Sequence, residues 1–287
     1  MSCEICNGSG WKTVEMDGVE SVTRCDCWRE TLVAQAYREA RIPTRYARCE
    51  LGNFEHNDMN SLRSAWQKAR AFVDAFPVVE QGLLFHGPTG VGKTHLAIGV
   101  LKEVVRRKGA RAYFFETGEL LKLVRDTYNR SVEETELDVL RPVFEADLLV
   151  LDDLGTEKTS EWVQETLGLV VNTRYNARRA TIFTSNLSDR ADEPVLQNTF
   201  VYQLGLRTRS RLREMCDWIP MDGIDVREVG PHASPSDIVR WQKTSPSSPE
   251  NLKKAGGFPT RARNMARAQL RDKGSAELKW SGGKAGS

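Results

Sequence analysis

The most informative stretch of this 287-residue chain is Gly87-Pro-Thr-Gly-Val-Gly-Lys-Thr94, which fits the pattern G-x-x-x-x-G-K-[ST]. An apolar run at 82–86, expected to be a strand, precedes it, and a helical pattern begins at Lys93. Between a strand and a helix, the backbone N–H groups of such a loop turn inward around a phosphate, and the dipole at the helix N-terminus attracts its negative charge. The alternative is a chance glycine-rich turn. Lys93 is expected to reach the β- and γ-phosphates and Thr94 to bind Mg²⁺. The predicted phosphate loop consists of Gly87, Pro88, Thr89, Gly90, Val91, Gly92, Lys93 and Thr94.

Helical patterns and apolar runs alternate around this loop. Helices are expected at 60–74, 93–107, 118–128 and 161–178, and strands at 82–86, 111–115, 148–151 and 180–184. The run 148–151 is apolar throughout, which is typical of a strand covered on both faces. Thr117 is the expected N-cap of the helix that begins at 118. Strands separated by helices of this length predict right-handed crossovers, a parallel sheet and an α/β fold of three layers.

Polar side chains follow two of the predicted strands. Asp152 and Asp153 come after 148–151, where carboxylates coordinate Mg²⁺ and polarise an attacking water. Asp152 is the predicted metal-side acid and Asp153 the candidate base, whereas a solvated pair capping a helix is the alternative. A whole strand separates the phosphate loop from these acids along the chain, so their two strands are not expected to be sheet neighbours. Asn186, after 180–184, is expected beside the phosphate strand, where it positions the lytic water or only forms a turn.

Arginines gather in a later helical segment. Arg207 and Arg211 are four residues apart and share a helix face, while Arg209 points away from them. One interpretation is a solvated basic face. The other is an arginine finger that reaches the γ-phosphate of a neighbouring subunit and stabilises the charge of the transition state. Arg227, which follows a short apolar patch, is a candidate phosphate contact within its own subunit.

Four of the six cysteines lie close together near residue 1, as Cys3-x-x-Cys6 and Cys25-x-Cys27. Paired spacing of this kind in a cytosolic chain favours metal over disulfides. The four thiolates suit one tetrahedral zinc ion in a structural site, because no ligand position stays open. A redox dithiol and inert thiols are the alternatives. With one short helix expected at 28–40, residues 1–57 are predicted to form a small module whose folding energy comes from the metal.

Composition and charge set the remaining limits. Hydrophobic residues make up 40% and charged residues 28%, which excludes wholesale disorder and a fibrous fold. Because no apolar run is long enough to cross a bilayer, a cytoplasmic protein without membrane contact is expected.

Residues 231–287 differ in composition from the rest of the chain. Gly, Pro and Ser make up 19 of these 57 residues, and 11 Lys and Arg stand against 4 Asp and Glu. Residues 1–230 carry the opposite balance, with 30 Lys and Arg against 35 Asp and Glu. The segment is predicted to be a largely disordered basic tail, with a transient helix at 260–272. Salt-sensitive nucleic-acid contact and simple solubilisation are its two alternative roles.

The motifs GPTGVGKT, LLVLDDLG, TSN, RTRSR and GIDVR follow one another between residues 87 and 227. This ordered set resembles the AAA+ ATPases of the DnaC-type helicase loaders, with the IstB-type transposition helpers as close relatives. The segments Ile42-Pro-Thr-Arg-Tyr46 and Leu51-Gly-Asn-Phe54 also look like the approach to the ATPase core in these loaders. The resemblance covers about residues 42–230 and implies an AAA+ domain at 58–230 with an abbreviated lid.

The resemblance also implies a role for each matched residue: ATP and Mg²⁺ binding for Lys93 and Thr94, the acid pair for Asp152 and Asp153, sensor 1 for Asn186, the arginine finger for Arg211 and sensor 2 for Arg227. Many AAA+ proteins have Glu where this chain has Asp153, which is one methylene shorter. Slow ATP hydrolysis, stimulated by DNA or a partner, is therefore expected.

The loaders bind single-stranded DNA inside a spiral oligomer, and two segments here resemble their DNA-contacting segments. One contains Tyr128, and the other contains Ser160 and Trp162. Stacking of bases on aromatic rings tolerates any sequence, which suits a loader, whereas ordinary helix packing is the alternative for both rings. In several loaders a small N-terminal domain binds the replicative helicase, and the cysteine module at 1–57 is expected to do the same.

Together with these motifs, the resemblance implies an ATP-dependent loader that places a hexameric replicative helicase on single-stranded DNA, with its subunits assembled head to tail. An IstB-type transposition helper, which forms filaments on duplex DNA and recruits a transposase, is the first alternative. A nucleotide-dependent adaptor that does not hydrolyse ATP is the second. The expected cofactors are ATP, Mg²⁺ and a structural Zn²⁺.

Overall fold

The computed structural model describes residues 3–7, 9–16, 19–56, 59–129, 134–189 and 195–230, together with 237, 240, 243 and 244. The chain divides into two units, Met1–Pro231 and His232–Ser287. The expected disorder of the tail and its helix at 260–272 lie outside the described residues. None of the described helices combines the length and apolar character that crossing a membrane requires.

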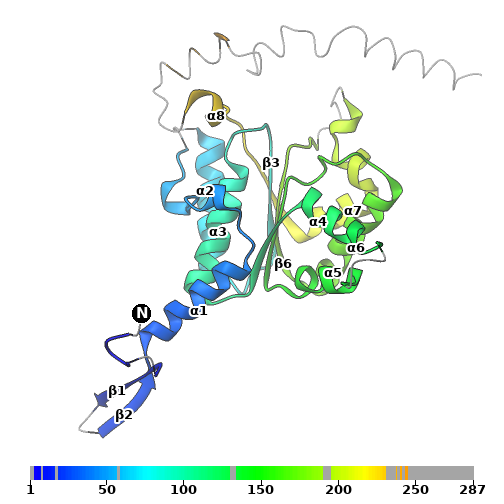
Figure 1. Cartoon of the computed structure of the whole chain (residues 1–287). Coiled ribbons are helices and arrows are strands. Elements are labelled where there is room, and N and C mark those ends of the chain that lie inside the picture. Colours follow the sequence, from blue (N-terminus) through cyan, green and yellow to red (C-terminus); the bar gives the residue numbers. More distant parts are fainter. Residues whose placement is uncertain are drawn as a thin grey trace, which may run out of the picture. The chain divides into compact units, whose positions relative to one another are not determined.

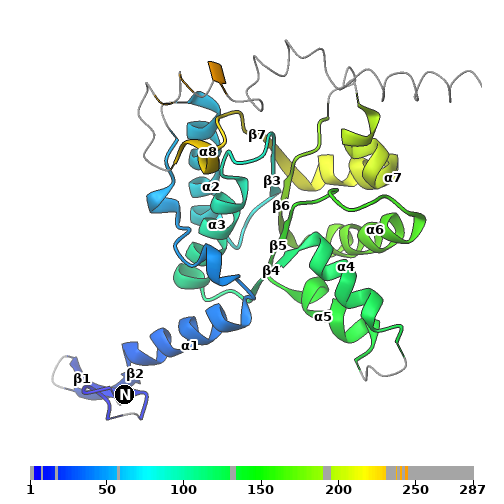
Figure 2. The same ribbon diagram turned by 45° about the horizontal axis from the view of Figure 1, so that its top comes forward.

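A five-stranded parallel sheet forms the centre of the first unit, in the order β4-β5-β6-β3-β7 (Figures 1 and 2; all five strands are labelled in Figure 2). The strands are β3 (Gly82–His86), β4 (Ala112–Glu116), β5 (Leu148–Asp152), β6 (Ala180–Ser185) and β7 (Cys216–Pro220). β6 lies between β3 and β5, so the strand of the phosphate loop and the strand of the acid pair are not neighbours, as predicted.

Helices cover both faces of this sheet, which confirms the predicted three-layer α/β fold (Figures 1 and 2). One face carries α2 (Asn60–Ala75) and α3 (Lys93–Lys108), and the other carries α4 (Thr117–Asp126), α5 (Glu136–Glu145), α6 (Glu161–Asn176) and α7 (Phe200–Met215). Two further helices are α1 (Asp26–Glu39) and α8 (Val226–Val229). The described residues also contain three short 3₁₀ helices, Thr44–Tyr46, Leu51–Asn53 and Leu196–Asn198.

The core of each layer follows from the alternation of side chains along the strands. Leu83 and Phe85 of β3 point to the α2–α3 side, whereas Leu84 between them points to the opposite side. All three side chains are at most 4% exposed. Because both faces are covered, the strands are apolar runs without polar alternation, and this is why they were recognisable in the sequence.

Some local predictions were wrong or incomplete. Thr117 is not an N-cap: Glu116 occupies that position without a side-chain bond, and the buried Thr117 hydroxyl donates to the Asp152 carbonyl oxygen at 2.7 Å. Helix α5, which was not predicted, opens with a capping box in which Thr135 and Asp138 bond each other's backbone N–H groups. Its interior Pro142 is the residue that disguised it.

An antiparallel hairpin of β1 (Trp11–Met16) and β2 (Val19–Arg24) also escaped prediction. Its strands are polar and expose most of their described side chains, so they lack an apolar run. The Asp-Gly dipeptide at 17–18 between two β-branched stretches is the sequence signal that indicates such a hairpin.

Candidate nucleotide-binding site

The phosphate loop joins β3 to α3, and three of its glycines have backbone angles that other residues rarely adopt. Gly87, Gly90 and Gly92 have φ values of 145°, 82° and 98°. All three are also closely packed, because a Cβ atom would lie 2.0 Å from the Met221 carbonyl oxygen at Gly87, 1.9 Å from an Asp225 carboxylate oxygen at Gly90 and 2.7 Å from the Phe54 ring at Gly92. The loop therefore needs glycine both for its conformation and for space.

Lys93 folds back over the loop. Its Nζ donates to the carbonyl oxygens of Gly87 and Pro88, at 2.9 and 2.7 Å, and to Asn186 Oδ1 at 2.7 Å. Burial of this ammonium lowers its pKa to about 8, and the nearby carboxylate of Asp153 opposes that shift. The side chain thus holds a positive charge at pH 7 in the place where a phosphate would bind.

Thr94 and Asp152 meet directly below the loop. The Thr94 hydroxyl donates to Asp152 Oδ1 at 2.8 Å, and Thr184 Oγ1 donates to the same oxygen at 2.6 Å. Burial raises the pKa of Asp152, and the bonds from Thr184 and Thr94 oppose that rise. A hydroxyl and a carboxylate at this separation fit the oxygen-rich ligand set that Mg²⁺ prefers.

Asn186 links the cation of the loop to the second acid. Its amide nitrogen donates to Asp153 Oδ1 at 2.9 Å, while its oxygen accepts the bond from Lys93. Asp153 has a left-handed backbone, with φ 57°, and its N–H donates to Thr184 Oγ1 at 2.9 Å. Non-glycine residues held in this conformation cluster at functional sites, so the geometry supports Asp153 and Asn186 as candidate site residues.

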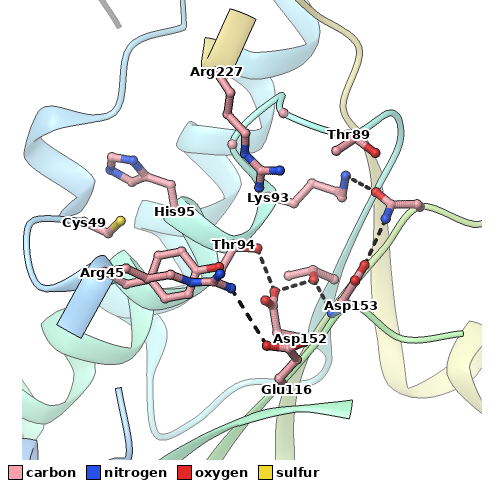
Figure 3. Close-up of a pocket in the computed structure, with 15 residues that line it drawn as sticks. Arg45, Cys49, Thr89, Lys93, Thr94, His95, Glu116, Asp152, Asp153 and Arg227 are labelled. Carbon is pink, nitrogen blue, oxygen red and sulfur yellow. Dashed lines mark hydrogen bonds and ion pairs between the residues drawn. The ribbon is translucent and has the colours of Figure 1, made fainter. Parts of the chain in front are cut away.

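These residues line a cavity of about 450 Å³ (Figure 3). Its volume lies within the range of about 300–1,000 Å³ that is common for small-molecule sites. Arg227 reaches the cavity from α8, and its contact with a phosphate stays a prediction. No sequence motif predicted a site role for the other lining residues, which are Arg45, Tyr46, Cys49, His95, Glu116 and Thr184. Glu116 and Thr184 occupy strand ends at the same edge as Asp152, and that position was their available signal.

The comparisons agree with this geometry. The chain matches the model of IstB-like ATP binding proteins over residues 21–224. It belongs to that family. Replicative helicase loader DnaC of Escherichia coli strain K12 is 25% identical over 161 residues, which are 55% of this chain and 63% of DnaC. The chain therefore matches less than two thirds of the length of that relative.

Solved structures show the same relationship. A crystal structure of the DnaC helicase loader has a TM-score of 0.56 and 32% identity, and the match covers 63% of this chain and 100% of the crystallised one. The replication initiator DnaA bound to AMPPCP and single-stranded DNA shares the fold, with a TM-score of 0.54 and 17% identity over 81% of this chain and 71% of DnaA. The DnaC/IstB-like AAA+ resemblance is thus confirmed for this ATP-binding chain.

The clustered arginines, from Arg207 to Arg213, lie on α7, which kinks at Gly205. Arg209 donates to Asp189 at 2.5 and 2.9 Å, and Arg213 bonds the same carboxylate. The guanidinium of Arg211 lies 5.8 Å from the centre of the Tyr175 ring, and Arg211 is not among the residues that line the cavity of its own chain. Its role as a finger toward another subunit remains a prediction.

The two predicted DNA-contacting rings lie together. Tyr128 and Trp162 have ring centroids 6.5 Å apart at 75°, and Trp162 Nε1 donates to the Tyr128 hydroxyl at 3.4 Å. Arg125 places its guanidinium 4.7 Å from the centre of the Trp162 ring. Ser160 is the N-cap of α6 and accepts from the Val163 N–H, so it has a structural role there. The Tyr128 ring is exposed, which leaves it accessible to a base.

The four predicted zinc ligands also come together. Their Sγ atoms all lie within 4.8 Å of one another, with 3.8 Å between Cys3 and Cys25 and 3.3 Å between Cys6 and Cys27. Zn–S bonds of about 2.3 Å in a tetrahedron place neighbouring sulfurs about 3.8 Å apart, so the set fits a structural zinc ion. A hydrogen bond to Cys6 and, as the second cause, a hydrogen bond to Cys25 raise the pKa of the Cys27 thiol.

Proposed function

We propose that this protein is an ATP-dependent loader that places a hexameric replicative helicase on single-stranded DNA during replication initiation. The observation that carries this proposal is the match of its ATPase core to the whole of the crystallised DnaC helicase loader. The cavity adds support, because it brings Lys93, Thr94, Asp152, Asp153 and Asn186 together in one place.

Hydrolysis of ATP follows from the roles of these side chains. The loop and Lys93 bind the phosphates. Thr94 and Asp152 would hold Mg²⁺, which would supply charge neutralisation of the phosphates when bound. Asp153 orients a water molecule and accepts its proton as the water oxygen bonds the γ-phosphorus and ADP leaves. Asn186 holds the Asp153 carboxylate in place through its 2.9 Å bond. We expect a slow rate, because the short Asp153 side chain places its carboxylate further from the water than Glu would.

Assembly of several subunits would bring a further positive charge to the γ-phosphate. Arg211 of one subunit would reach the γ-phosphate bound to the next, in a head-to-tail oligomer, and Arg227 would act within its own subunit. Dependence on a neighbour makes ATP a switch: turnover accelerates only in the assembled state and then releases the loader.

Single-stranded DNA would bind at the cluster of Arg125, Tyr128 and Trp162. An exposed aromatic ring with an arginine beside it can stack a base and pair with a phosphate, and each stacked base contributes about 1–3 kcal/mol without sequence preference. The cysteine module, folded around Zn²⁺, would bind the helicase, which leaves the ATPase core free to contact DNA.

A pull-down from a lysate of the native host with the tagged full chain tests this function. With ATP and Mg²⁺ the wild type should capture a hexameric replicative helicase, and Lys93→Ala should capture less. The second candidate, an IstB-type transposition helper, is kept because the matching family is IstB-like. Capture of a transposase, together with filaments on duplex DNA seen by electron microscopy, would favour that candidate and contradict the loader.

A further inference from the structure

The segment that leads into the ATPase core brings an arginine into the nucleotide cavity. Arg45 lies on the 3₁₀ helix Thr44–Tyr46, which follows α1 along the chain. It lines the same cavity as Lys93 and Arg227 (Figure 3). A third cation at this cavity has no role in the mechanism described above.

Arg45 is held only weakly in its present position. Its Nη2 lies 3.8 Å from Glu116 Oε2, and its guanidinium lies 4.4 Å from the centre of the Tyr46 ring. The side chains of Arg45 and Glu116 are 65% and 49% exposed. Ion pairs that are this open to solvent contribute little stability, so a stronger anion can take Arg45 from Glu116 at little cost.

The position of Glu116 shows which part of a nucleotide Arg45 faces. Glu116 is paired with Asp152 in the register of β4 and β5, and Asp152 bonds Thr94, the other expected Mg²⁺ ligand. Thr94 and Asp152 would hold Mg²⁺, which would neutralise charge on the terminal phosphates of a bound nucleotide. The Arg45 side of the cavity is therefore the expected metal side, and it adjoins the expected position of the γ-phosphate. The Tyr46 side chain is also close enough to respond to the charge of Asp152. Burial raises the pKa of Tyr46, and the negative charge of Asp152 adds to that rise.

We propose that Arg45 binds the γ-phosphate of ATP, exchanging its contact with Glu116 for one with the nucleotide, and thereby distinguishes ATP from ADP. A guanidinium presents two parallel N–H groups to phosphate oxygens, which makes the contact specific as well as strong. Arg45 also lies on the stretch of chain that joins the cysteine cluster to the ATPase core. Loss of the γ-phosphate would therefore remove a contact made directly by that linker.

Arg41 provides a matched control on the same stretch. Its Nη2 lies 3.1 Å from Glu119 Oε1 and its guanidinium lies 4.6 Å from the centre of the Phe115 ring, so it repeats the ion pair and the ring contact of Arg45. It does not line the cavity. Any effect that is specific to the nucleotide should therefore appear at Arg45 and not at Arg41.

The experiment is calorimetric titration of the full chain with ATPγS and with ADP, both with Mg²⁺, for the wild type, Arg45→Gln and Arg41→Gln. Loss of a charged hydrogen bond predicts that Arg45→Gln weakens ATPγS binding about tenfold and ADP binding less than twofold. Arg41→Gln should leave both affinities unchanged. If Arg45→Gln fails to fold, Arg45→Lys keeps the charge without the fork and should weaken ATPγS binding severalfold, again without an effect on ADP.

Two results would overturn the proposal: no change in the affinity for ATPγS, or equal weakening of ATPγS and ADP, which would give Arg45 a structural role only. The inference rests on ATP binding and not on the helicase. Because the titration contains neither helicase nor DNA, its failure would leave the loader proposal untouched, and failure of the loader proposal would leave this one standing.

Discussion

The ammonium of Lys93 makes ATP binding depend on pH in a range where few other groups titrate. Burial lowers its pKa to about 8 in the nucleotide-free protein. A bound triphosphate favours the charged form and raises the pKa again. Binding below pH 8 therefore meets an ammonium that is already charged, whereas binding above pH 8 requires uptake of a proton.

The expected magnitude follows from this pKa. At pH 9, one unit above the pKa, about one Lys93 in eleven carries its proton, so ATP affinity should be about tenfold weaker than at pH 7. The charged neighbours that face Lys93 are Asp152, Asp153, Asp225 and Arg227, and none of these residue types normally changes its charge between pH 7 and 9. The change in affinity can therefore be assigned to one side chain.

Calorimetric titration with ATPγS and Mg²⁺ at pH 7, 8 and 9 measures this directly, in buffers of different ionisation enthalpy so that proton uptake is counted as well. Lys93→Ala is the control and should bind weakly with an affinity that does not change over the same range. A wild-type affinity that is equal at pH 7 and pH 9, or a Lys93→Ala variant with the same pH dependence, would refute the reasoning.

Three other predictions concern the phosphate loop, the buried Asp152 and the cysteine cluster. Gly87→Ala should abolish ATPγS binding, because the new Cβ would meet the backbone carbonyl oxygen of Met221 at 2.0 Å; Gly109→Ala, also at positive φ but with open space around it, should cost only about 1 kcal/mol of unfolding free energy in urea denaturation and leave binding intact. Thr184→Val removes a donor to buried Asp152 and should lower the unfolding free energy by about 1–3 kcal/mol, which an unchanged urea midpoint would contradict. Cys6→Ser should lower the bound zinc measured by mass spectrometry from one ion per chain to almost none, while ATPγS binding persists; a wild type purified without zinc would contradict the assignment.

Much of the site could be predicted from the sequence because its motifs act locally. The phosphate loop needs only a strand, a turn and a helix that are contiguous in the chain. Asp152 and Asn186 were predicted as site residues because each follows an apolar run, and the carboxyl ends of parallel strands meet at one edge of the sheet. The 2.9 Å bond between Asn186 and Asp153 is a consequence of that arrangement.

The remaining parts depend on packing between distant segments, which local patterns do not encode. Arg45 lies 107 residues before Asp152 and approaches it only because the linker packs against the core around β4. Thr117 shows the same limit, since its hydroxyl bonds a carbonyl on the neighbouring strand when a helix cap was expected. The hairpin of β1 and β2 was missed for a different reason. Its Asp-Gly signal at 17–18 was present in the sequence, so it could have been predicted locally.

Loading of a replicative helicase onto single-stranded DNA under the control of ATP is the function that we propose for this protein. The most direct test mixes the full chain, the hexameric helicase of the same host and a closed circular single strand, and counts helicase that remains on the circle after gel filtration. We expect helicase on the DNA only with the wild-type protein and ATP, and little with Lys93→Ala or Arg211→Ala. Equal amounts of helicase on the circle with and without the protein would contradict it.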